Sequence, residues 1–156
     1  MIPKIKTCSE IKIIGLSAKI KMNEQDKIMA LWKQFMPRKH EIENLASEDL
    51  ISIQIYSDFN NLETPFDIWA CAEVLDGHNL PEAMETFMIP QGDYAIFNHK
   101  GMDAGATYQK IMTEWLPTSG YDIDARPHFQ VMGEKYKNGS SDSEEDFYVP
   151  IRLIKN

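Results

Sequence analysis

A strand, a sharp break and an amphipathic helix follow one another in residues 92–120, and this stretch constrains the fold more than any other. Residues 94–97 form an apolar run suited to a sheet. One apolar helical face then follows, at Tyr108, Ile111, Met112, Trp115 and Leu116. Pro117 lacks an amide donor and disfavours helix in the residue before it, so we expect the helix to end there.

The same unit occurs earlier in the chain. Residues 28–32 and 111–115 both have the pattern Ile-Met-x-x-Trp, and a proline follows each, at Pro37 and Pro117. A strand-like run precedes each copy and two strand-like runs follow it. This repetition predicts a duplicated β-α-β-β module. The alternative is chance similarity between two amphipathic helices.

Alternation of apolar and polar residues predicts further strands. They fall near residues 10–22, 51–56, 66–74, 84–90, 128–136 and 147–153, with loops at 58–65, 76–79 and 138–146. Gly15 could mark a bulge, and Pro150 favours an edge or a bulge. Asn23 is expected to cap a first helix that ends at Met36. No strand–helix alternation typical of a parallel sheet is present, so we expect an α+β fold with antiparallel pairing.

Length and composition indicate one domain, residues 1–156, with no apolar run long enough to cross a bilayer. The first residues lack the apolar region of a secretory signal, which favours the cytoplasm. Cys8 and Cys71 form no CxxC pair, and reduced thiols are expected. We therefore expect no membrane partner.

The formal net charge is −8, whereas a nucleic-acid binder normally carries a basic stripe. Direct nucleic-acid binding is therefore not expected. The acidity suits solubility, and it also suits a cationic ligand or a basic partner.

The sequence holds no recognisable catalytic or cofactor motif. His40, His78, His99 and His128 lack the spacing of metal ligands, and no phosphate-binding glycine loop or GxSxG element is present. We expect no metal, no cofactor and no catalytic residue that can be named.

Aromatic residues, carboxylates and an amide lie on strand faces whose neighbours are the better core candidates. These candidate ligand-binding residues are Tyr56, Trp69, Glu73, Gln130, Glu134 and Tyr148. Aromatic walls with a polar acceptor suit a planar or cationic organic ligand, so we expect Tyr56, Trp69 and Tyr148 to converge on one cleft. The alternative is that these are ordinary solvent-facing strand residues, although a tryptophan is rarely left fully exposed.

Four stretches carry a family resemblance. Residues 92–101 and 114–121, with the closing stretches 128–136 and 147–151, resemble the GyrI-like small-molecule-binding family, also called AraC-type or bacterial transcription-activator effector-binding domains. The resemblance implies a curved antiparallel sheet with two helices, and a groove between the halves that takes amphipathic, often cationic, molecules. Many members carry an N-terminal DNA-binding helix-turn-helix, and we expect this chain to be a stand-alone member.

One position departs from the family pattern. The family commonly has Phe-Glu where this chain has Phe129-Gln130, and that glutamate is the usual partner of a cationic ligand. Gln130 keeps hydrogen-bonding capacity without charge, so Glu73 or Glu134 would have to compensate.

The leading hypothesis is a stand-alone binder of small amphipathic, possibly cationic, organic molecules that acts in sensing or sequestration. One alternative is an interaction protein that acts on a larger partner such as DNA gyrase. The other is a hydrolase of strained electrophilic compounds, which the Gln130 departure weakens.

Overall fold

The computed structural model describes residues 1–58, 61, 63–77, 79–137 and 140–154. The predicted loops at 58–65, 76–79 and 138–146 include residues outside this set, His78 among them. The strands are β1 (Lys4–Cys8), β2 (Ile11–Ile20), β3 (Leu50–Ile55), β4 (Phe66–Glu73), β5 (Glu85–Ile89), β6 (Gly92–Lys100), β7 (Tyr121–Ile123), β8 (His128–Met132) and β9 (Glu144–Leu153). The helical segments are α1 (Gln25–Phe35), the 3-10 turn η1 (Met36–Glu41), α2 (Ala104–Lys110), the π-helical turn η2 (Ile111–Trp115) and α3 (Leu116–Ser119).

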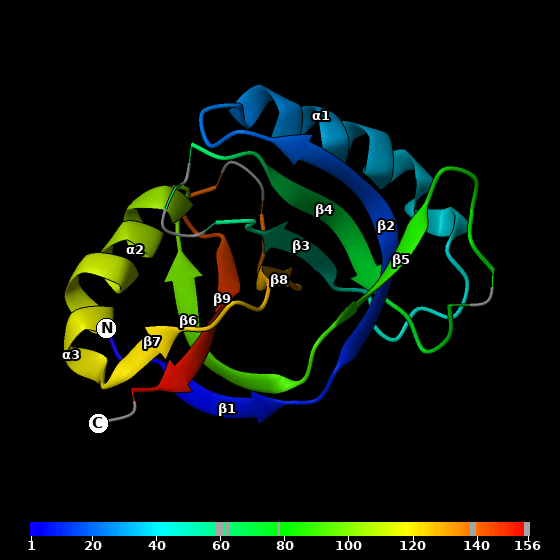
Figure 1. Ribbon diagram of the computed structural model, residues 1–156. Helices are drawn as coiled ribbons and strands as arrows, with labels where there is room; N and C mark the ends of the chain where they lie inside the picture. The colour runs from blue at the N-terminus through cyan, green and yellow to red at the C-terminus, as the bar shows by residue number, and fades with distance from the viewer. Residues whose placement is uncertain (59–60, 62, 78, 138–139, 155–156) are drawn as a thin grey trace.

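Within the described residues the strands form one curved antiparallel sheet in the order β1-β6-β9-β8-β3-β4-β2-β5, with β7 paired to β9 beside this path (Figure 1). The α+β fold expected from the sequence is therefore confirmed. Each half has the same internal order, because its first strand pairs with its third and its third with its second. The orders are β2-β4-β3 and β6-β9-β8, and β3 pairs with β8 at the centre. This agreement supports the predicted duplication.

The strands at the two ends of this order, β1 and β5, close the sheet. In the pairing of β1 with β6, the residue numbers of each pair add to 100, as in Lys4↔Ile96. The same sum holds for the pairing of β2 with β5, as in Ile11↔Ile89, so both pairings share one register. One antiparallel ribbon thus continues without a register shift from one end of the sheet to the other. It holds the two halves in a rolled arrangement.

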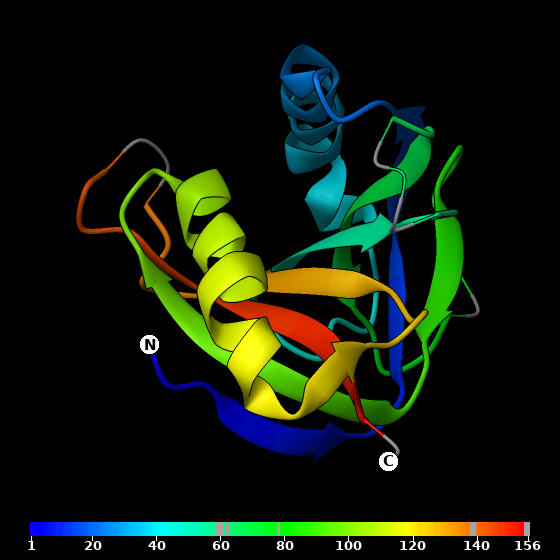
Figure 2. The ribbon, with the colours of Figure 1, turned by 60° about the vertical axis from the view of Figure 1, so that its left-hand side comes forward.

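Both helices cover the same face of the sheet. Leu31 and Phe35 of α1 pack with Ile68 of β4, while Ile111 packs with Phe97 of β6 and other apolar residues of the second half. Trp32 and Trp115 join these two clusters, as the repeated Ile-Met-x-x-Trp pattern predicts. Figure 2 shows α1 and the α2–α3 stretch standing apart over the two halves.

The predicted stop at Pro117 is wrong. The chain stays helical to Ser119, and Gly120 ends it in the left-handed conformation at φ 83°. The π-helical turn makes this possible: the Leu116 N–H donates to the Ile111 carbonyl, five residues back. Pro117 then occupies the first turn of α3, where a missing amide donor costs little.

The predicted cap at Asn23 is also wrong. Glu24 occupies the cap position of α1 and makes no side-chain cap. Its carboxylate instead accepts a hydrogen bond from the Lys21 backbone N–H at 2.8 Å and pairs with the Lys27 ammonium at 2.5 Å. These contacts, rather than a side-chain N-cap, stabilise the turn that leads into α1.

Gly15 marks close approach rather than a bulge. The pairing of β2 with β4 is unbroken from Ile13↔Glu73 to Ile20↔Phe66. A Cβ at Gly15 would lie 2.2 Å from the Ala70 carbonyl oxygen, so only glycine fits there.

The last strand, β9, begins at Glu144, three residues before the start predicted from the sequence. Residues 144–146 were expected in a loop because they are acidic, but Glu144, Glu145 and Asp146 pair with β6. Pro150 lies inside the sheet on β9, between the residues that pair with β8 and those that pair with β7. Its missing N–H therefore interrupts neither ladder.

Candidate functional site

A groove of about 870 Å³ lies between the two halves, on the face covered by the helices. Its floor comes from the central strands, with Gln54 of β3, Tyr56 directly after β3 and Gln130 of β8. Ile28 of α1 lines one side and Met112, in the π-helical turn, lines the other. The groove therefore depends on the relative placement of both halves.

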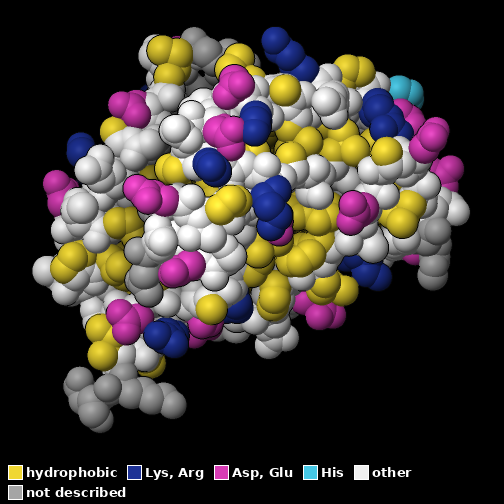
Figure 3. All heavy atoms as spheres, turned by 45° about the horizontal axis from the view of Figure 1, so that its top comes forward, with side chains coloured by type: hydrophobic (Ala, Val, Ile, Leu, Met, Phe, Trp, Pro, Cys, Tyr) yellow, Lys and Arg dark blue, Asp and Glu magenta, His cyan; other side chains and the backbone are white. Residues whose placement is uncertain are grey.

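Strand alternation decides which side chains reach the groove. Ser52 and Gln54 of β3 line the groove, as does Tyr56, the residue after β3. Ile51 and Ile53 belong to the apolar cluster on the opposite face. Apolar side chains such as Ile28, Ile68 and Met112 line the groove around these groups. On the α1 side, Figure 3 shows hydrophobic groups gathered among scattered charges. The amides and hydroxyls of the floor are therefore set into an apolar surround.

Gln130 and Gln54 face each other across the central pair of strands. Each Nε2 donates to the Oε1 of the other at 2.8 Å, and Gln54 Nε2 also donates to the Ser52 hydroxyl at 3.1 Å. The floor is therefore a neutral, hydrogen-bonded amide platform.

Aromatic rings surround this platform. Tyr56 packs against Phe66, with ring centroids 4.8 Å apart, and its edge meets the His128 ring at 5.2 Å. Tyr108 of α2 is hydrogen-bonded to His128 Nδ1. We assign the phenol as donor, because a phenol is a stronger acid than a neutral imidazole. These rings offer faces on which an organic ligand can stack.

Burial shifts the pKa values of this cluster so that the neutral form of each group is favoured. Desolvation lowers the pKa of His128 to about 3 and raises the pKa of Tyr56 to about 12. Desolvation also raises the pKa of Tyr108 well above its ordinary value. The aromatic cluster is therefore uncharged at neutral pH.

Glu145 brings the negative charge. It lies on β9, lines the groove beside Phe147, and its pKa is raised by burial. Across the described residues, no hydrogen bond or ion pair to its carboxylate is found. A half-buried carboxylate without a cation is costly in the free protein, and a cationic ligand would relieve that cost.

The structure brings two of the six predicted site residues together and separates the others. Tyr56 and Gln130 line the groove. Trp69 and Tyr148 belong to the apolar cluster on the opposite face, where Trp69 packs on Phe87 and Tyr148 stacks on Phe129 at 4.4 Å. The expected convergence of Tyr56, Trp69 and Tyr148 on one cleft is therefore wrong, because odd and even positions of a strand face opposite ways.

The two predicted glutamates do not line the groove either. Glu73 shares the face of Trp69 on β4, and its charge acts on Tyr148. Glu134 follows β8 and is exposed. Neither compensates within the groove for the amide at position 130.

Sequence reasoning missed two residues that line the groove, Tyr108 and Glu145, and also His128, which is buried and hydrogen-bonded to Tyr108. Tyr108 was assigned to a helical core face, and His128 was read as one of several scattered histidines, although it alternates in phase with Gln130. Glu145 was hidden in an acidic run read as a loop. Its position two residues before the apolar Phe147 puts it on the same strand face as Phe147 once β9 is known to begin at Glu144.

The chain matches the GyrI-like small molecule binding domain over residues 1–152. It is 32% identical over 129 residues to the transcriptional regulator BrlR of Pseudomonas aeruginosa, a match that covers 81% of this chain and 47% of BrlR. The chain thus corresponds to about half the length of this curated relative. Among the described residues, no helix has the length and apolar character needed to cross a membrane.

Two solved structures share the fold. The C-terminal domain of EcmrR superposes with a TM-score of 0.70 at 17% identity, covering 97% of each chain. SAV2435 bound to tetraphenylphosphonium superposes with a TM-score of 0.68 at 12% identity, covering 97% of this chain and 94% of SAV2435. With its family match over nearly the whole length, this chain belongs to the GyrI-like small-molecule-binding family.

Proposed function

We propose that the groove binds a small amphipathic organic cation, and that ligand occupancy serves sensing or sequestration. The observation that carries this is the half-buried carboxylate of Glu145, which has no ion-pair partner among the described residues and lies at an apolar, aromatic-lined groove. Coulomb attraction in a low-dielectric groove favours a positive ligand, and aromatic faces add cation–π attraction.

Glu145 takes the role that a glutamate at position 130 would otherwise have. Gln130 is held in its amide pair with Gln54, so it contributes shape and hydrogen bonding rather than charge. The charge comes instead from β9, at the edge of the platform. Selectivity for cations is thereby kept although the floor is neutral.

We also propose that the protein works in the cytoplasm. Cys8 and Cys71 are free thiols within the described chain, and both are buried in the apolar cluster opposite the groove. Free thiols suit a reducing compartment.

Calorimetric titration of the purified protein with tetraphenylphosphonium and with neutral triphenylphosphine oxide tests the proposal. Both probes carry a triphenyl unit on phosphorus, and triphenylphosphine oxide lacks the positive charge and has an oxygen in place of the fourth ring. We expect the cation to bind about tenfold more tightly, because only the cation gains Coulomb attraction to the Glu145 carboxylate. Equal affinity would contradict the assignment to cations, and absence of binding by both would contradict the groove as a ligand site.

The groove itself is tested by filling it. Met112→Trp places a large ring in the space between the helices, because Met112 lines the groove from the π-helical turn. Tetraphenylphosphonium binding should be lost while thermal unfolding stays cooperative. Met29→Trp is the matched control, since Met29 is exposed on α1 and does not line the groove.

A further inference from the structure

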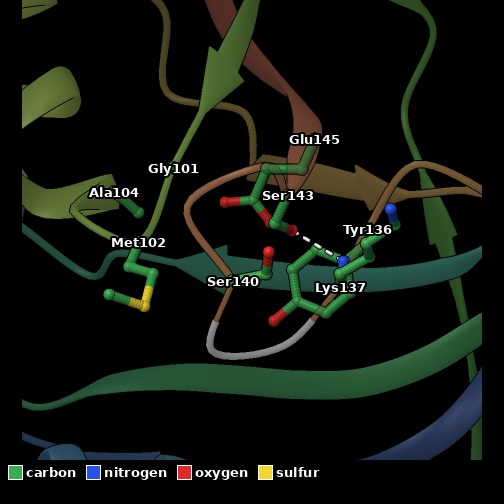
Figure 4. Close-up of a pocket in the computed structure, with 8 residues that line it drawn as sticks. All are labelled: Gly101, Met102, Ala104, Tyr136, Lys137, Ser140, Ser143 and Glu145. Atoms are coloured by element: carbon green, nitrogen blue, oxygen red, sulfur yellow. Dashed lines mark hydrogen bonds between the residues drawn. The ribbon is translucent and has the colours of Figure 1, made fainter.

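A second, smaller cavity adjoins the groove. It measures about 210 Å³ and lies between the turn after β6 and the connection from β8 to β9. Figure 4 shows Met102 and Ala104 on one side of it and Tyr136, Ser140, Ser143 and Glu145 on the other. Ala104 and Glu145 line both cavities, so the smaller one is a side pocket of the groove.

The side pocket differs from the groove in chemistry. Oxygen atoms of two serines, a tyrosine and a carboxylate face it, whereas the groove is mostly apolar. The Ser143 hydroxyl accepts a hydrogen bond from the Lys137 backbone N–H at 2.7 Å, and the Ser140 hydroxyl accepts one from the Asp142 N–H at 3.1 Å. These bonds fix the serines in place.

Two polar groups of the pocket remain open. In the described part of the chain, neither the Tyr136 hydroxyl nor the Glu145 carboxylate has a hydrogen-bond partner. Lys137 also lines the pocket, but it forms no ion pair with Glu145 within the same residues. The pocket therefore offers acceptors and one uncompensated negative charge.

We propose that the side pocket takes a primary or secondary ammonium group, carried on a short arm by a ligand whose apolar body fills the groove. A protonated amine has N–H donors and no acceptor, which complements the Glu145 carboxylate and the Tyr136 oxygen. A quaternary ammonium or a phosphonium has the charge without the donors. It would leave the pocket acceptors unsatisfied and desolvated.

This inference rests on the proposed function and narrows it. Permanent lipophilic cations can fill the groove alone, whereas ligands with an N–H cation on an arm use both cavities. The volume of the side pocket, about 210 Å³, suits an aminoalkyl arm. Natural ligands should therefore be elongated amines rather than compact quaternary ions.

Three probes with a shared body test this: 3-(1-naphthyl)propylamine, its N,N,N-trimethylammonium analogue and 3-(1-naphthyl)propan-1-ol. Each is titrated into the full chain, with tetraphenylphosphonium as the groove-only probe. We expect the primary amine to bind about tenfold more tightly than the trimethylammonium analogue, as for the loss of charge-assisted hydrogen bonds. The alcohol should be the weakest of the three.

Tyr136→Phe removes one acceptor from the pocket and leaves the groove intact. It should reduce the preference for the primary amine severalfold while the affinity for tetraphenylphosphonium stays at the wild-type value. Tyr121→Phe is the matched control, because Tyr121 lies on β7 and lines neither cavity.

The outcomes separate the two proposals. If tetraphenylphosphonium binds but the trimethylammonium analogue equals the primary amine, or if Tyr136→Phe leaves their ratio unchanged, the side pocket is overturned and the groove stands. If none of the cations binds, the groove proposal falls and the side pocket falls with it.

Discussion

Gln54 and Gln130 join the two halves of the molecule through a reciprocal amide pair, with both N–H···O distances at 2.8 Å. The pair spans β3 and β8, the strands at the centre of the sheet. A carboxylate at position 130 could keep one of these bonds, but it would place an oxygen against Gln54 Oε1. The amide pair therefore leaves the groove floor uncharged, and it keeps two hydrogen bonds between the halves where a glutamate would keep one.

Gln130→Glu should raise the affinity for tetraphenylphosphonium relative to triphenylphosphine oxide by about 1–2 kcal/mol, as for other charge-assisted contacts. It should also lower the free energy of unfolding by about 1 kcal/mol, because one amide hydrogen bond is lost. Matched titrations and denaturant unfolding measure the two effects. If wild type and Gln130→Glu show the same ratio of the two affinities at every pH from 5 to 8, position 130 does not face the ligand.

Glu145 should make cation binding depend on pH. Burial raises its pKa above 4.5, so the carboxyl is neutralised as pH falls through that raised value, and tetraphenylphosphonium should then bind more weakly. The probe itself does not titrate. The groups around Glu145 are His99, its cross-strand neighbour on β6, and Tyr136 and Lys137 of the side pocket. In Glu145→Gln the affinity should vary less between pH 4 and pH 7, and identical profiles would reject the assignment.

The same carboxylate should cost stability in the free protein. A group whose folded pKa lies above its unfolded pKa stabilises the fold at low pH, and this stabilisation is lost as pH rises through the folded pKa. Glu145→Gln should therefore raise the melting temperature at pH 7 while it weakens cation binding. A lower melting temperature would mean that the carboxylate has a structural partner.

His128 should make the free energy of unfolding depend on pH between about 6.5 and 3. Its folded pKa of about 3 lies below the ordinary 6.5, so stability present above pH 6.5 is lost as pH falls from 6.5 towards 3. The loss amounts to about 1.4 kcal/mol per pH unit, or about 2 kcal/mol at pH 5. His128→Asn keeps an acceptor near Nδ1 for Tyr108 without titrating in this range. Its unfolding free energy should fall less steeply with acid, and parallel curves would exclude His128 as the cause.

Trp69 should act on stability rather than on binding. It is 6% exposed and packs in the cluster with Ile13, Ile53 and Phe87 on the face opposite the groove. Trp69→Ala should therefore cost about 3–5 kcal/mol of unfolding free energy. Under conditions where the variant is folded, its affinity for tetraphenylphosphonium should match that of the wild type. A selective loss of affinity would place Trp69 in a ligand site after all.

Much of the fold follows from periodicity and from the repeat. Alternation located most strands, and Ile-Met-x-x-Trp located both helices, because these patterns record which side of an element is buried. The pattern gives no information about hydrogen-bond register inside a helix. The pattern therefore could not predict the π-helical turn, which lets the helix continue past Pro117.

The site was harder to predict than the fold. Alternation assigns two faces to a strand, but it does not say which face meets the helices when both are apolar. Trp69 and Tyr148 were assigned to the groove face, and the structure places them on the other one. Glu145 could be placed only after β9 was known to begin at Glu144, because its ladder with β6 is a contact between distant parts of the chain.

The dissociation constant of tetraphenylphosphonium for Glu145→Gln, measured beside wild type and Glu134→Gln at neutral pH, tests the cation groove most directly. Both substitutions remove one negative charge, but only Glu145 lines the groove, while Glu134 is exposed after β8. We predict about tenfold weaker binding for Glu145→Gln, because the Coulomb attraction to the cation is lost, and wild-type binding for Glu134→Gln. Equal dissociation constants for all three proteins, or equal weakening in both variants, would contradict a cation site centred on Glu145.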